Sequence, residues 1–568
     1  MITNKEIARI FDEIADILEV KEGDKFKIRA YRKAARTIES LTQDLSDFSS
    51  VTELKKLPSI GDALAKKIHE IITSGKLEYY EELRTSVPEG VLELLSIPNV
   101  GPKTVSKLYN ECNVTDIESL ELAAKNHRLQ HLFGMGRKTE ERILKGIEQY
   151  RRHKERIPLG KAYFQAKNIV KSLENLDAVE RIAFAGSIRR MRETIGDIDI
   201  LVASENPSRV MSAFKALDGI TEIIASGDTK SSVIMDDTQV DLRVVRDDSF
   251  GSALQYFTGS QLHNIKLREL ALKQGLKLNE YGVFKGDQPV AGKREEEVYE
   301  ALGLPFIPPE LREDQGEIEA AIEGELPDLI ELNRIKGDLH IHSRWSDGKN
   351  SIEEVVDKAR SLGYEYVAIC DHSPAIGITR GVNEEKLLDE IIEIERINED
   401  LSDFKVLTGI EVDIRSDNTL DLPDKILEKL DIVLAAVHTK FSQSKDAMTR
   451  RIISAIKNPH VDIIAHPTGR LIGKRDPYDL DIEAVLDAAR DTRTILEINA
   501  NPRRLDLKDI HARYAKEKGV KVAISTDAHD ISQMELMPFG VATARRGWLE
   551  PEDVLNTRSL DELMRNLK

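Results

Sequence analysis

The chain has 568 residues, of which 40% are hydrophobic, and a formal net charge of −18. That length suits roughly three to five domains. No apolar run reaches the roughly 18 residues of a membrane span, and the N-terminus lacks the basic-then-apolar pattern of a secretory signal. The two cysteines, Cys112 and Cys370, are too few for a disulfide framework. These features favour a soluble, cytoplasmic protein over a membrane or secreted one.

The negative charge argues against nucleic-acid binding only at first sight, because it is unevenly distributed. Residues 1–160 carry nearly equal numbers of basic and acidic side chains, so the acidic excess lies in residues 161–568. Net charge limits non-specific binding but is compatible with a local basic surface.

Residues 1–150 are expected to be helical, because Leu and Ile recur at three- and four-residue spacing. One pattern recurs there: an apolar residue, a tight turn, and a glycine that opens an amphipathic helix carrying Lys or Arg. Backbone N–H groups at such a helix start can bind phosphate without reading bases. A single copy is often an ordinary turn, but repetition favours a nucleic-acid backbone as the ligand. The copies are residues 57–61, 97–101 and 133–136, ending on Gly61, Gly101 and Gly136.

Paired acids mark the next segment, residues 151–245. In Asp197-Ile198-Asp199 the alternation of a strand places both carboxylates on one face, and Asp241 lies on another expected strand. Neighbouring carboxylates repel one another unless cations lie between them. Two divalent ions about 3.5–4 Å apart would suit in-line phosphoryl transfer. The strands expected in this segment are 182–185, 197–202 and 239–244.

A flexible turn with cations precedes these acids. Gly186-Ser187 is followed by Arg189 and Arg190, which suit a triphosphate. An isolated Asp-x-Asp is more often a solvated edge, but the full combination points to nucleotide chemistry. Residues 250–306 are expected to form short helices and turns. Residues 308–335 then follow as an acidic, solvated linker or exposed helix.

From residue 335 the pattern changes to strands alternating with helices, which predicts a parallel α/β barrel or a doubly wound sheet. Six of the chain's 13 histidines lie at the ends of these expected strands, together with carboxylates. Imidazole and carboxylate suit Zn, Mn or Fe, and so many ligands suggest two or three ions. The expected strands are 337–342, 366–371, 405–413, 431–438, 461–466, 494–499 and 521–526. The expected ligands are His340, His342, Asp347, His372, Glu411, His438, His466, Asp527 and His529, with Asp371 beside them.

Residues 1 to about 305 resemble the family X DNA polymerases. The palm motif is carried by Gly186, Ser187, Arg190, Gly196, Asp197, Asp199 and Asp241, and a second motif is Tyr256-Phe257-Thr258-Gly259-Ser260 with Asn264 and Arg268. The resemblance implies that Asp197 and Asp199 bind two metal ions and that Asp241 binds the catalytic one. It further implies that Ser187, Arg190 and Gly196 hold the incoming triphosphate.

The second motif implies further contacts to the nucleotide. Tyr256 and Phe257 would pack beside the sugar, near Gly259, while Asn264 would touch the base and Arg268 the template strand. Gln261 and His263 stand where the family commonly has other side chains, so no role is carried over to them.

The N-terminal segment is similar to the small lyase domain of the same family. The resemblance places the Schiff-base lysine at Lys67, with Lys27 near the DNA, and an amine must be neutral to attack an aldehydic sugar. Ser59, Phe26 and Ala63 depart from the family's usual residues at the 5′-phosphate pocket. Lys67 as a surface lysine that only contacts phosphate is an equal alternative.

Residues 336–568 resemble the PHP (polymerase and histidinol phosphatase) domain, a distorted seven-stranded barrel. The resemblance implies metal-dependent phosphoester hydrolysis, and in polymerase fusions a 3′–5′ exonuclease with apurinic endonuclease and 3′-phosphodiesterase capability. Arg415, Lys440, Arg470 and Arg503 are candidates for steering DNA. The expected division is 1–85 and 86–150 (helix-hairpin-helix), 151–245 (palm), 246–307 (nucleotide and template subdomain), 308–335 (linker) and 336–568 (PHP domain).

Together these features predict a gap-filling repair polymerase with a 3′–5′ exonuclease. Its expected partners are gapped or primer-template DNA and dNTPs, and it is expected to be a monomer. Two Mg²⁺ or Mn²⁺ ions are expected in the palm, and two to three Zn²⁺ or Mn²⁺ ions in the PHP domain. Three alternatives stay open: the rear domain as a small-molecule phosphatase, the rear domain as a scaffold, and a transferase that needs no template.

Overall fold

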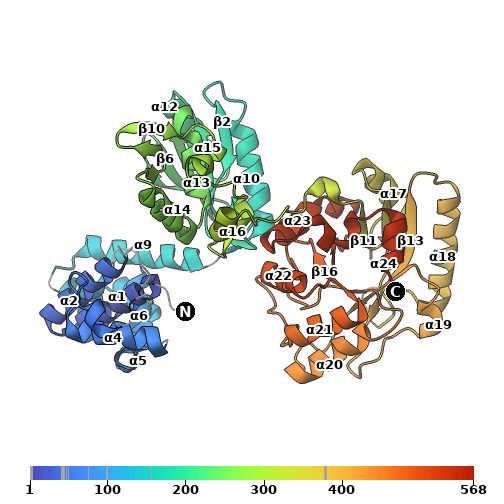
Figure 1. The fold of residues 1–568 in the computed structure, drawn as a ribbon, viewed down its shortest axis with the longest axis horizontal. Coiled ribbons are helices and arrows are strands. Elements are labelled where there is room, and N and C mark those ends of the chain that lie inside the picture. Colours follow the sequence, from blue (N-terminus) through green and yellow to red (C-terminus); the bar gives the residue numbers. More distant parts are fainter. Residues whose placement is uncertain are drawn as a thin grey trace. The chain divides into compact units, whose positions relative to one another are not determined.

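A computed structural model gives the fold in two compact units, Met1–Arg156 and Ile157–Lys568, each of which is described by itself (Figure 1). The residues described are 4–39, 45, 48, 50–74, 76–97, 100–132, 134–154, 156–375 and 380–568. Among the described residues no helix is both long and apolar enough to cross a membrane.

The first unit is helical, as the spacing of Leu and Ile predicts. A single apolar core runs through it, from Phe11 and Ile68 to Leu108 and Ile147, so the two expected helical domains share one interior. Helix α7 ends at Asn113, which adopts a left-handed conformation, and Asp116 begins α8 with a capping box. The helices are α1 (Asn4–Val20), α2 (Lys25–Glu39), α3 (Val51–Leu54), α4 (Asp62–Ser74), α5 (Glu78–Thr85), α6 (Glu89–Glu93), η2 (Leu94–Ser96), α7 (Pro102–Cys112), α8 (Ile117–Lys125), η3 (Arg128–His131) and α9 (Arg137–Lys154).

The second unit begins with the palm, a five-stranded sheet in the order β2-β4-β7-β6-β5. Alternate residues of the interior strand β4 pack on opposite faces: Ile200 lies against helices α10 and α12, and Leu201 lies against α13. The three expected strands are present within one or two residues, but the hairpin β5–β6 was not expected. The elements are β1 (Ile157–Pro158), α10 (Leu159–Leu173), β2 (Arg181–Phe184), α11 (Gly186–Arg189), β3 (Thr194–Ile195), β4 (Ile198–Ala203), α12 (Pro207–Lys215), β5 (Ile220–Ser226), β6 (Lys230–Met235) and β7 (Thr238–Val245).

Residues 246–307 contain an antiparallel sheet, β10-β9-β8, beside the expected helices. Its strands are only three or four residues long, too short to show an alternating pattern, which explains why only helices and turns were expected from the sequence. The elements are η4 (Asp247–Ser249), α13 (Phe250–Thr258), α14 (Gln261–Lys273), β8 (Lys277–Asn279), β9 (Gly282–Lys285), β10 (Gln288–Ala291) and α15 (Glu295–Ala301).

Residues 308–335 differ from the solvated linker that their composition suggests. They form η5 (Pro309–Leu311), α16 (Glu317–Glu323) and η6 (Leu332–Arg334). The Arg312 side chain is fully buried, pairs with Glu295 and donates to the Ile307 carbonyl at 2.8 Å. Glu317 is also buried and lies 2.6 Å from His263 Nδ1. Charge alone suggested exposure, but each buried charge here has a partner of opposite sign or a hydrogen bond.

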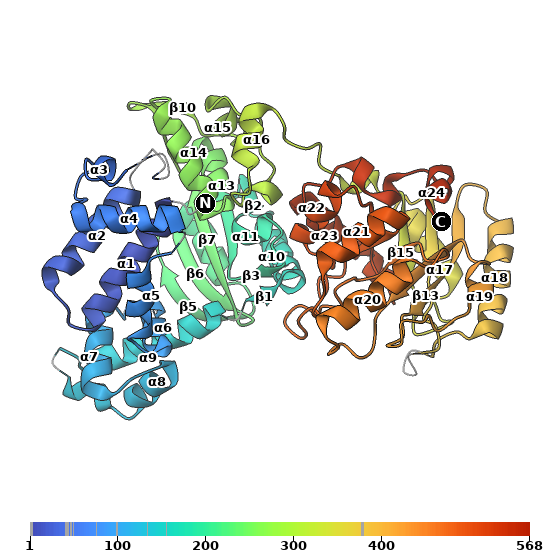
Figure 2. The same cartoon turned by 60° about the horizontal axis from the view of Figure 1, so that its bottom comes forward.

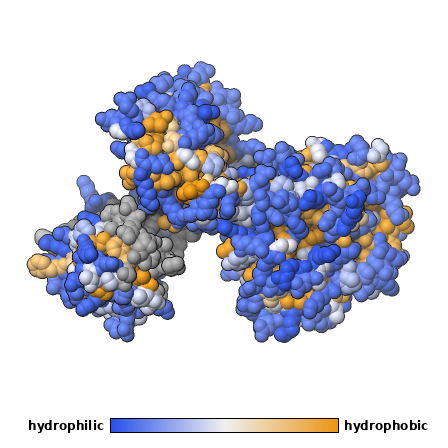
Figure 3. All heavy atoms as spheres, viewed as in Figure 1, coloured by the Kyte–Doolittle hydropathy of each residue, from blue (hydrophilic) through white to orange (hydrophobic). Residues whose placement is uncertain are grey.

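The rear domain is a parallel barrel of seven strands in chain order, β11 to β17 (Figures 1 and 2). Its ends approach closure, because Ile341 bridges Ala528 and His342 N–H donates to the Ala528 carbonyl at 2.9 Å. Of the two expected architectures, the barrel is therefore confirmed over the open doubly wound sheet. On the face drawn in Figure 3, hydrophilic side chains cover most of this domain.

The barrel strands and their connections run as the alternating pattern predicts. The strands are β11 (Gly337–Ile341), β12 (Tyr366–Ile369), β13 (Lys405–Asp413), β14 (Ile432–Ala436), β15 (Ile463–Ile464), β16 (Ile495–Asn499) and β17 (Val522–Ser525). The helices are α17 (Ile352–Ser361), α18 (Glu384–Glu399), α19 (Asp424–Leu427), α20 (Lys445–Ile456), α21 (Ile482–Thr492), α22 (Asp509–Glu517), η7 (Ile531–Leu536), α23 (Met537–Arg546), η8 (Pro551–Asp553), η9 (Leu555–Thr557) and α24 (Leu560–Asn566).

Candidate active sites

The palm carboxylates converge at the start of β4. Asp199 on β4 is in direct register with Asp241 on the parallel strand β7, and Asp197 immediately precedes β4. Burial, followed by the charges of Asp197 and Asp241, raises the pKa of Asp199 to about 8. Lys230 opposes this shift and lies 3.1 Å from Asp241 Oδ2. Carboxylates that repel one another in this way suit divalent cations such as Mg²⁺ or Mn²⁺.

Gly186 makes room for this cluster. Its φ is +61°, and a Cβ built on it would lie 1.9 Å from Asp199 Oδ2. The position therefore requires glycine for both its backbone conformation and its lack of a side chain. Ser187 follows Gly186 in the first turn of α11.

Arg190, expected to hold the triphosphate, is held by two neighbours. Its Nε donates to Glu313 Oε1 at 2.9 Å and its Nη1 to the Thr258 carbonyl at 2.7 Å. Burial lowers the pKa of Arg190, although Glu313 opposes that effect. The neighbouring Arg189 serves packing instead, because its guanidinium forms two hydrogen bonds to Glu295 at 2.7 Å.

The nucleotide-subdomain residues lie on α13 and α14. The Tyr256 and Phe257 rings meet edge to face, with centroids 5.1 Å apart. Asn264 was expected to touch a base, but its side-chain amide forms hydrogen bonds within the protein. Nδ2 donates to the Tyr256 carbonyl at 2.6 Å, and Oδ1 accepts from Gln255 at 2.9 Å. Arg268 Nε donates to the Asn264 carbonyl at 3.3 Å. A Cβ at Gly259 would meet Asn264 Oδ1 at 2.4 Å, so this glycine fixes the close packing of the two helices.

His263, which received no role from the sequence, is buried between subdomains. Its Nδ1 lies 2.6 Å from Glu317 and its Nε2 lies 3.2 Å from the Tyr299 hydroxyl. Both ring nitrogens are thus satisfied inside the protein. A structural role explains why this residue departs from the family's usual choice.

The three hairpin glycines lie where the sequence predicts, directly before α4, α7 and α9. A Cβ built on Gly61, Gly101 or Gly136 would meet no atom within 4 Å, so these backbones face open space. Ser59, where glycine is usual, has φ +63°. A surface cavity of about 360 Å³ lies beside the second and third hairpins. Its lining is Lys103, Thr104, Lys107, Gly134, Met135, Thr139, Arg142 and Ile143. Pro98, Asn99 and Phe133 of these hairpins lie outside the described residues.

Lys67 has the surroundings that a reactive amine needs. It is half-buried on α4, with Nζ 3.6 Å from the centroid of the Tyr79 ring. Burial lowers the pKa of Lys67, and nearby Lys27 adds to that effect although Glu70 and Glu82 oppose it. A larger fraction of the amine is therefore neutral than in an ordinary lysine.

The barrel histidines and acids gather at the C-terminal ends of the strands. Three groups have ligand atoms within 4.8 Å of one another, and His466 joins them through Nε2, which lies 2.9 Å from Glu411 Oε1. The structure thus brings together all nine expected ligands. The groups are His342, Asp347, His372 and His529; His340, His342 and Asp527; and His372, Glu411 and His438.

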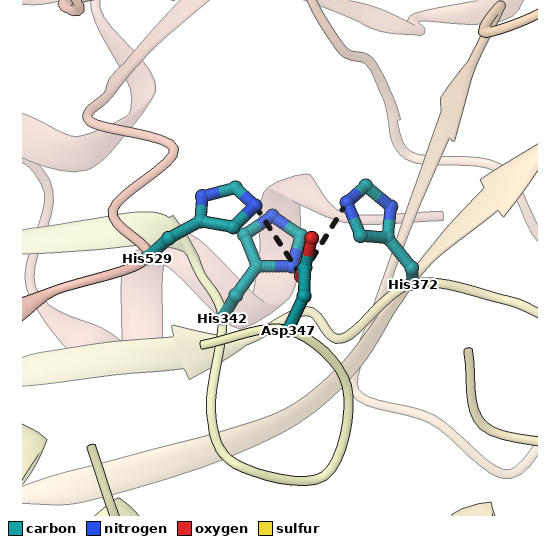
Figure 4. A group of neighbouring side chains, drawn as sticks. All are labelled: His342, Asp347, His372 and His529. Atoms are coloured by element: carbon teal, nitrogen blue, oxygen red, sulfur yellow. Dashed lines mark ion pairs between the residues drawn. The ribbon is translucent and has the colours of Figure 1, made fainter. Parts of the chain in front are cut away.

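Figure 4 shows the first of these groups. Asp347, from the loop after β11, lies 3.4 Å from His529 Nε2 and 3.8 Å from His372 Nε2, while the His342 ring lies between the two imidazoles. His340 Nε2 and His342 Nε2 face one another at 3.1 Å. Buried Glu411 Oε2 lies 2.8 Å from His372 Nδ1, although the two groups are not aligned as a hydrogen bond. Inward-facing imidazole nitrogens around a buried carboxylate fit bound metal ions.

The surroundings of the metal-ligand cluster shift the pKa values of its acids and imidazoles. The pKa of Glu411 lies well below its usual value although burial opposes this, because His438, His372 and His340 surround it. Burial lowers the pKa of His466 to about 4. The ionised acid and the neutral imidazole are both the forms that bind metal.

Several residues that support the barrel metal-ligand cluster were not predicted from the sequence. Glu497 Oε1 lies 2.7 Å from His340 Nδ1, and Asp413 Oδ1 lies 3.2 Å from His438 Nδ1, so each fixes a ligand ring. A glutamate inside the apolar run Ile495-Leu496-Glu497-Ile498 was the available signal. Arg504 also reaches Asp527 Oδ2 at 3.4 Å.

Two expectations need correction. Asp371, grouped with the ligands because it ends a strand, accepts hydrogen bonds from Ser343 N–H at 2.9 Å and from the Ser343 and Ser346 hydroxyls. It therefore orders the loop that carries Asp347. Arg470, a candidate for steering DNA, is buried and lies 2.8 Å from Glu193, so it is not free to bind a strand.

The palm presents a cluster of acids on a nucleotidyltransferase-like sheet, and the barrel presents acids together with imidazoles. Both sets suit metal-dependent phosphoryl chemistry. Comparisons with known families agree. The matches are a helix-hairpin-helix domain at residues 2–77, a SAM-like helix-hairpin-helix tandem at 91–149, the DNA polymerase beta thumb at 253–313 and the PHP domain at 338–501.

Relatives cover both halves of the chain. DNA polymerase/3′-5′ exonuclease PolX of Bacillus subtilis (strain 168) is 42% identical over 569 residues, covering 99% of each chain. A probable phosphatase of Caldanaerobacter subterraneus subsp. tengcongensis is 33% identical over 41% of this chain and 92% of its own. DNA polymerase lambda of Arabidopsis thaliana is 26% identical over 54% of this chain and 62% of its own. The chain belongs to the family X DNA polymerases that carry a C-terminal PHP domain.

Proposed function

We propose that the palm of this chain extends DNA 3′ ends to fill short gaps during repair and that its PHP domain hydrolyses 3′-terminal phosphodiesters. The chain is accordingly a DNA polymerase with a 3′–5′ exonuclease, as the name of the Bacillus subtilis relative states for that protein. One observation carries the proposal: two separate sets of ligands are each assembled, with Asp199 paired to Asp241 on the palm sheet and nine side chains at one end of the barrel.

In the palm, the residues divide the work of nucleotide addition. Asp197 and Asp199 would hold two Mg²⁺ or Mn²⁺ ions and Asp241 the catalytic one. When bound, such ions neutralise charge on the attacking and leaving oxygens. Asp241 would also accept the proton of a primer 3′-hydroxyl. Gly186, Ser187, Arg190 and Gly196 would hold the incoming triphosphate.

The subdomain residues of α13 and α14 complete the nucleotide site. Tyr256, Phe257 and Gly259 would line the sugar, and Arg268 would approach the template. Asn264 can reach a base only if its internal hydrogen bonds rearrange. A substrate-induced movement of α14 would supply that change.

In the barrel, two to three Zn²⁺ or Mn²⁺ ions would be held by His340, His342, Asp347, His372 and the five remaining ligands. When bound, they would activate water and polarise a phosphoryl oxygen. Glu497 and Asp413 keep the His340 and His438 rings oriented. Arg504 lies next to Asp527, where it can contact a substrate phosphate. Apurinic endonuclease and 3′-phosphodiesterase activities would use the same chemistry on a different 3′ or abasic substrate.

Helix-hairpin-helix glycines would bind the DNA backbone, and Lys67 would act as a 5′-deoxyribose-phosphate lyase. The lowered pKa of Lys67 supports the second role, and the open backbones of Gly61, Gly101 and Gly136 support the first. Lys27 is exposed and can add a phosphate contact. Gapped or primer-template DNA and dNTPs are the proposed partners of a cytoplasmic monomer.

A small-molecule phosphatase is the second candidate for the barrel, because the probable phosphatase of Caldanaerobacter aligns with 41% of this chain. The two candidates differ in substrate. Comparing hydrolysis of a 3′-recessed duplex with that of a small phosphate monoester decides between them. Preference for the monoester would overturn the exonuclease proposal, and fewer than two bound ions per purified chain would favour a purely structural barrel.

A further inference from the structure

The guanidinium of Arg190 is held by hydrogen bonds at Nε and Nη1, and its side chain is 13% exposed. Glu313 accepts from Nε and the Thr258 carbonyl accepts from Nη1, while Nη2 forms no hydrogen bond to any residue that the structure describes. Glu313 belongs to the segment between η5 and α16, outside the palm. An arginine whose Nε is held by a hydrogen bond has a fixed guanidinium orientation. Its remaining N–H groups can then donate to phosphate oxygens in a defined geometry.

Glu313 is itself held by a residue of the PHP domain. Arg546, at the end of α23, lies with Nη1 3.2 Å from Glu313 Oε1 and donates from the same nitrogen to the Arg190 carbonyl at 2.9 Å. Its Nε and Nη2 lie 2.9 and 2.7 Å from Asp509 Oδ2 on α22. The Arg546 side chain is only 5% exposed. The barrel therefore fixes both the main chain of Arg190 and the carboxylate that orients its side chain.

The turn that leads from Arg190 to the palm acids is held at a second point. Glu193 Oε2 lies 2.8 Å from Arg470 Nη1, and Arg470 follows the metal ligand His466 by four residues. Arg470 Nε also donates to the Arg504 carbonyl at 2.8 Å. Two arginines of the barrel thus hold residues 190 and 193, which lie between the triphosphate turn and Asp197.

The ionised state of Glu313 strengthens its contacts with Arg190 and Arg546. Glu313 is 10% exposed in its side chain, and its pKa lies below its usual value because Arg190, Arg546 and Arg192 outweigh the effect of burial. The carboxylate therefore stays ionised at neutral pH. Charge-assisted hydrogen bonds in such a buried network are stronger than those between exposed groups.

We propose that Glu313 and Arg546 are positioning residues for polymerisation, which orient Arg190 toward the incoming triphosphate, so that the PHP domain forms part of the polymerase's nucleotide site. This inference rests on the proposed role of Arg190. It gives the barrel a second function that is independent of its own hydrolysis. The nucleotide-binding turn is completed by a side chain more than 350 residues later in the chain, because Arg546 and Arg190 are 356 residues apart.

The test measures KM for dNTP and kcat on a primer-template for E313A, E313Q, R546A and R190Q in the full chain. E313A and R546A are expected to raise KM by about tenfold with a smaller change in kcat, as expected for the loss of one charged hydrogen bond. E313Q is expected to stay within about twofold, because both arginines address Oε1 and glutamine keeps an acceptor there. Exonuclease activity and thermal unfolding of the same preparations report on folding.

The matched control is R545A. Arg545 neighbours Arg546 on α23 and pairs with Glu310 at 2.8 Å, but it forms no hydrogen bond or ion pair with Arg190 or Glu313. If KM rises equally in R545A and R546A, the effect comes from a general loosening of the contact between α23 and residues 308–335. That result would overturn the inference. A lower or unchanged KM in E313A would overturn it too. If R190Q leaves KM unchanged, the proposed role of Arg190 itself is wrong.

Discussion

Asp199 occupies the space that a side chain at position 186 would need: its Oδ2 lies 1.9 Å from where the Cβ of Gly186 would be. Glycine at this position thus allows the triphosphate turn to approach the metal-binding acids. The positive φ of Gly186 adds a second requirement, because L side chains disfavour that region. Two parts of the polymerase motif, which are separated by 13 residues in sequence, therefore constrain one another directly.

Substitution of Gly186 by alanine should reduce nucleotide addition by about 100-fold or more, because Asp199 or the turn must move out of metal-binding geometry. Primer extension measures this loss. The exonuclease should remain at the wild-type level, since the barrel lies elsewhere in the fold. Retention of full polymerase activity in G186A would show that the turn can relax without affecting the acids.

Glu497 offers a test of the barrel centre that leaves all nine ligands intact. E497Q should lower metal affinity by about 10- to 100-fold, because the His340 ring loses the carboxylate that orients it. The exonuclease should then need more Mn²⁺ for half-maximal activity, while primer extension should be unchanged.

The matched control for E497Q is E390Q. Glu390 is equally buried but is not one of the nine ligands, and burial, followed by the charge of Asp371, raises its pKa well above the usual value. If E497Q and wild type need the same Mn²⁺ concentration for half-maximal exonuclease activity, Glu497 does not support metal binding.

Lys67 should be trapped on DNA that carries a 5′-deoxyribose phosphate when borohydride reduces the Schiff base. Burial lowers the pKa of Lys67 from 10.5, so its neutral fraction at a given pH is larger than that of an ordinary lysine. Adduct formation should consequently rise with pH and level off at a pH below the pKa of an ordinary lysine.

K67A should abolish the adduct, whereas K66A should not. Lys66 is the neighbouring residue, but it is exposed and pairs with Asp62 at 2.9 Å. Trapping that persists in K67A would assign the Schiff base to another amine.

The sequence predicts this architecture well where one rule decides the outcome. The ends of parallel strands meet at one end of a barrel, so histidines and acids that follow seven apolar runs had to converge. Strand β13 even has the expected bounds, Lys405–Asp413. Asp371 fails for a related reason: it ends a strand like the ligands, but nearby serines supply its hydrogen bonds.

Features set by tertiary contacts could not be predicted in this way. The strands β8 to β10 are too short to show an alternating pattern, and the burial of Arg312 depends on Glu295, which lies 17 residues earlier in the chain. The contacts of Arg546 with Glu313 and with the Arg190 carbonyl join distant segments. No local pattern of charge or spacing contains that information.

The central claim is that one chain holds two separate catalytic sites. Nucleotide addition and 3′ hydrolysis should be measured on the same 3′-recessed duplex with the double variant D197A/D199A and with H342A. The first should lose extension and keep hydrolysis, and the second should do the reverse, each with an unfolding temperature near that of wild type. Loss of both activities in either folded variant would contradict the two-site account.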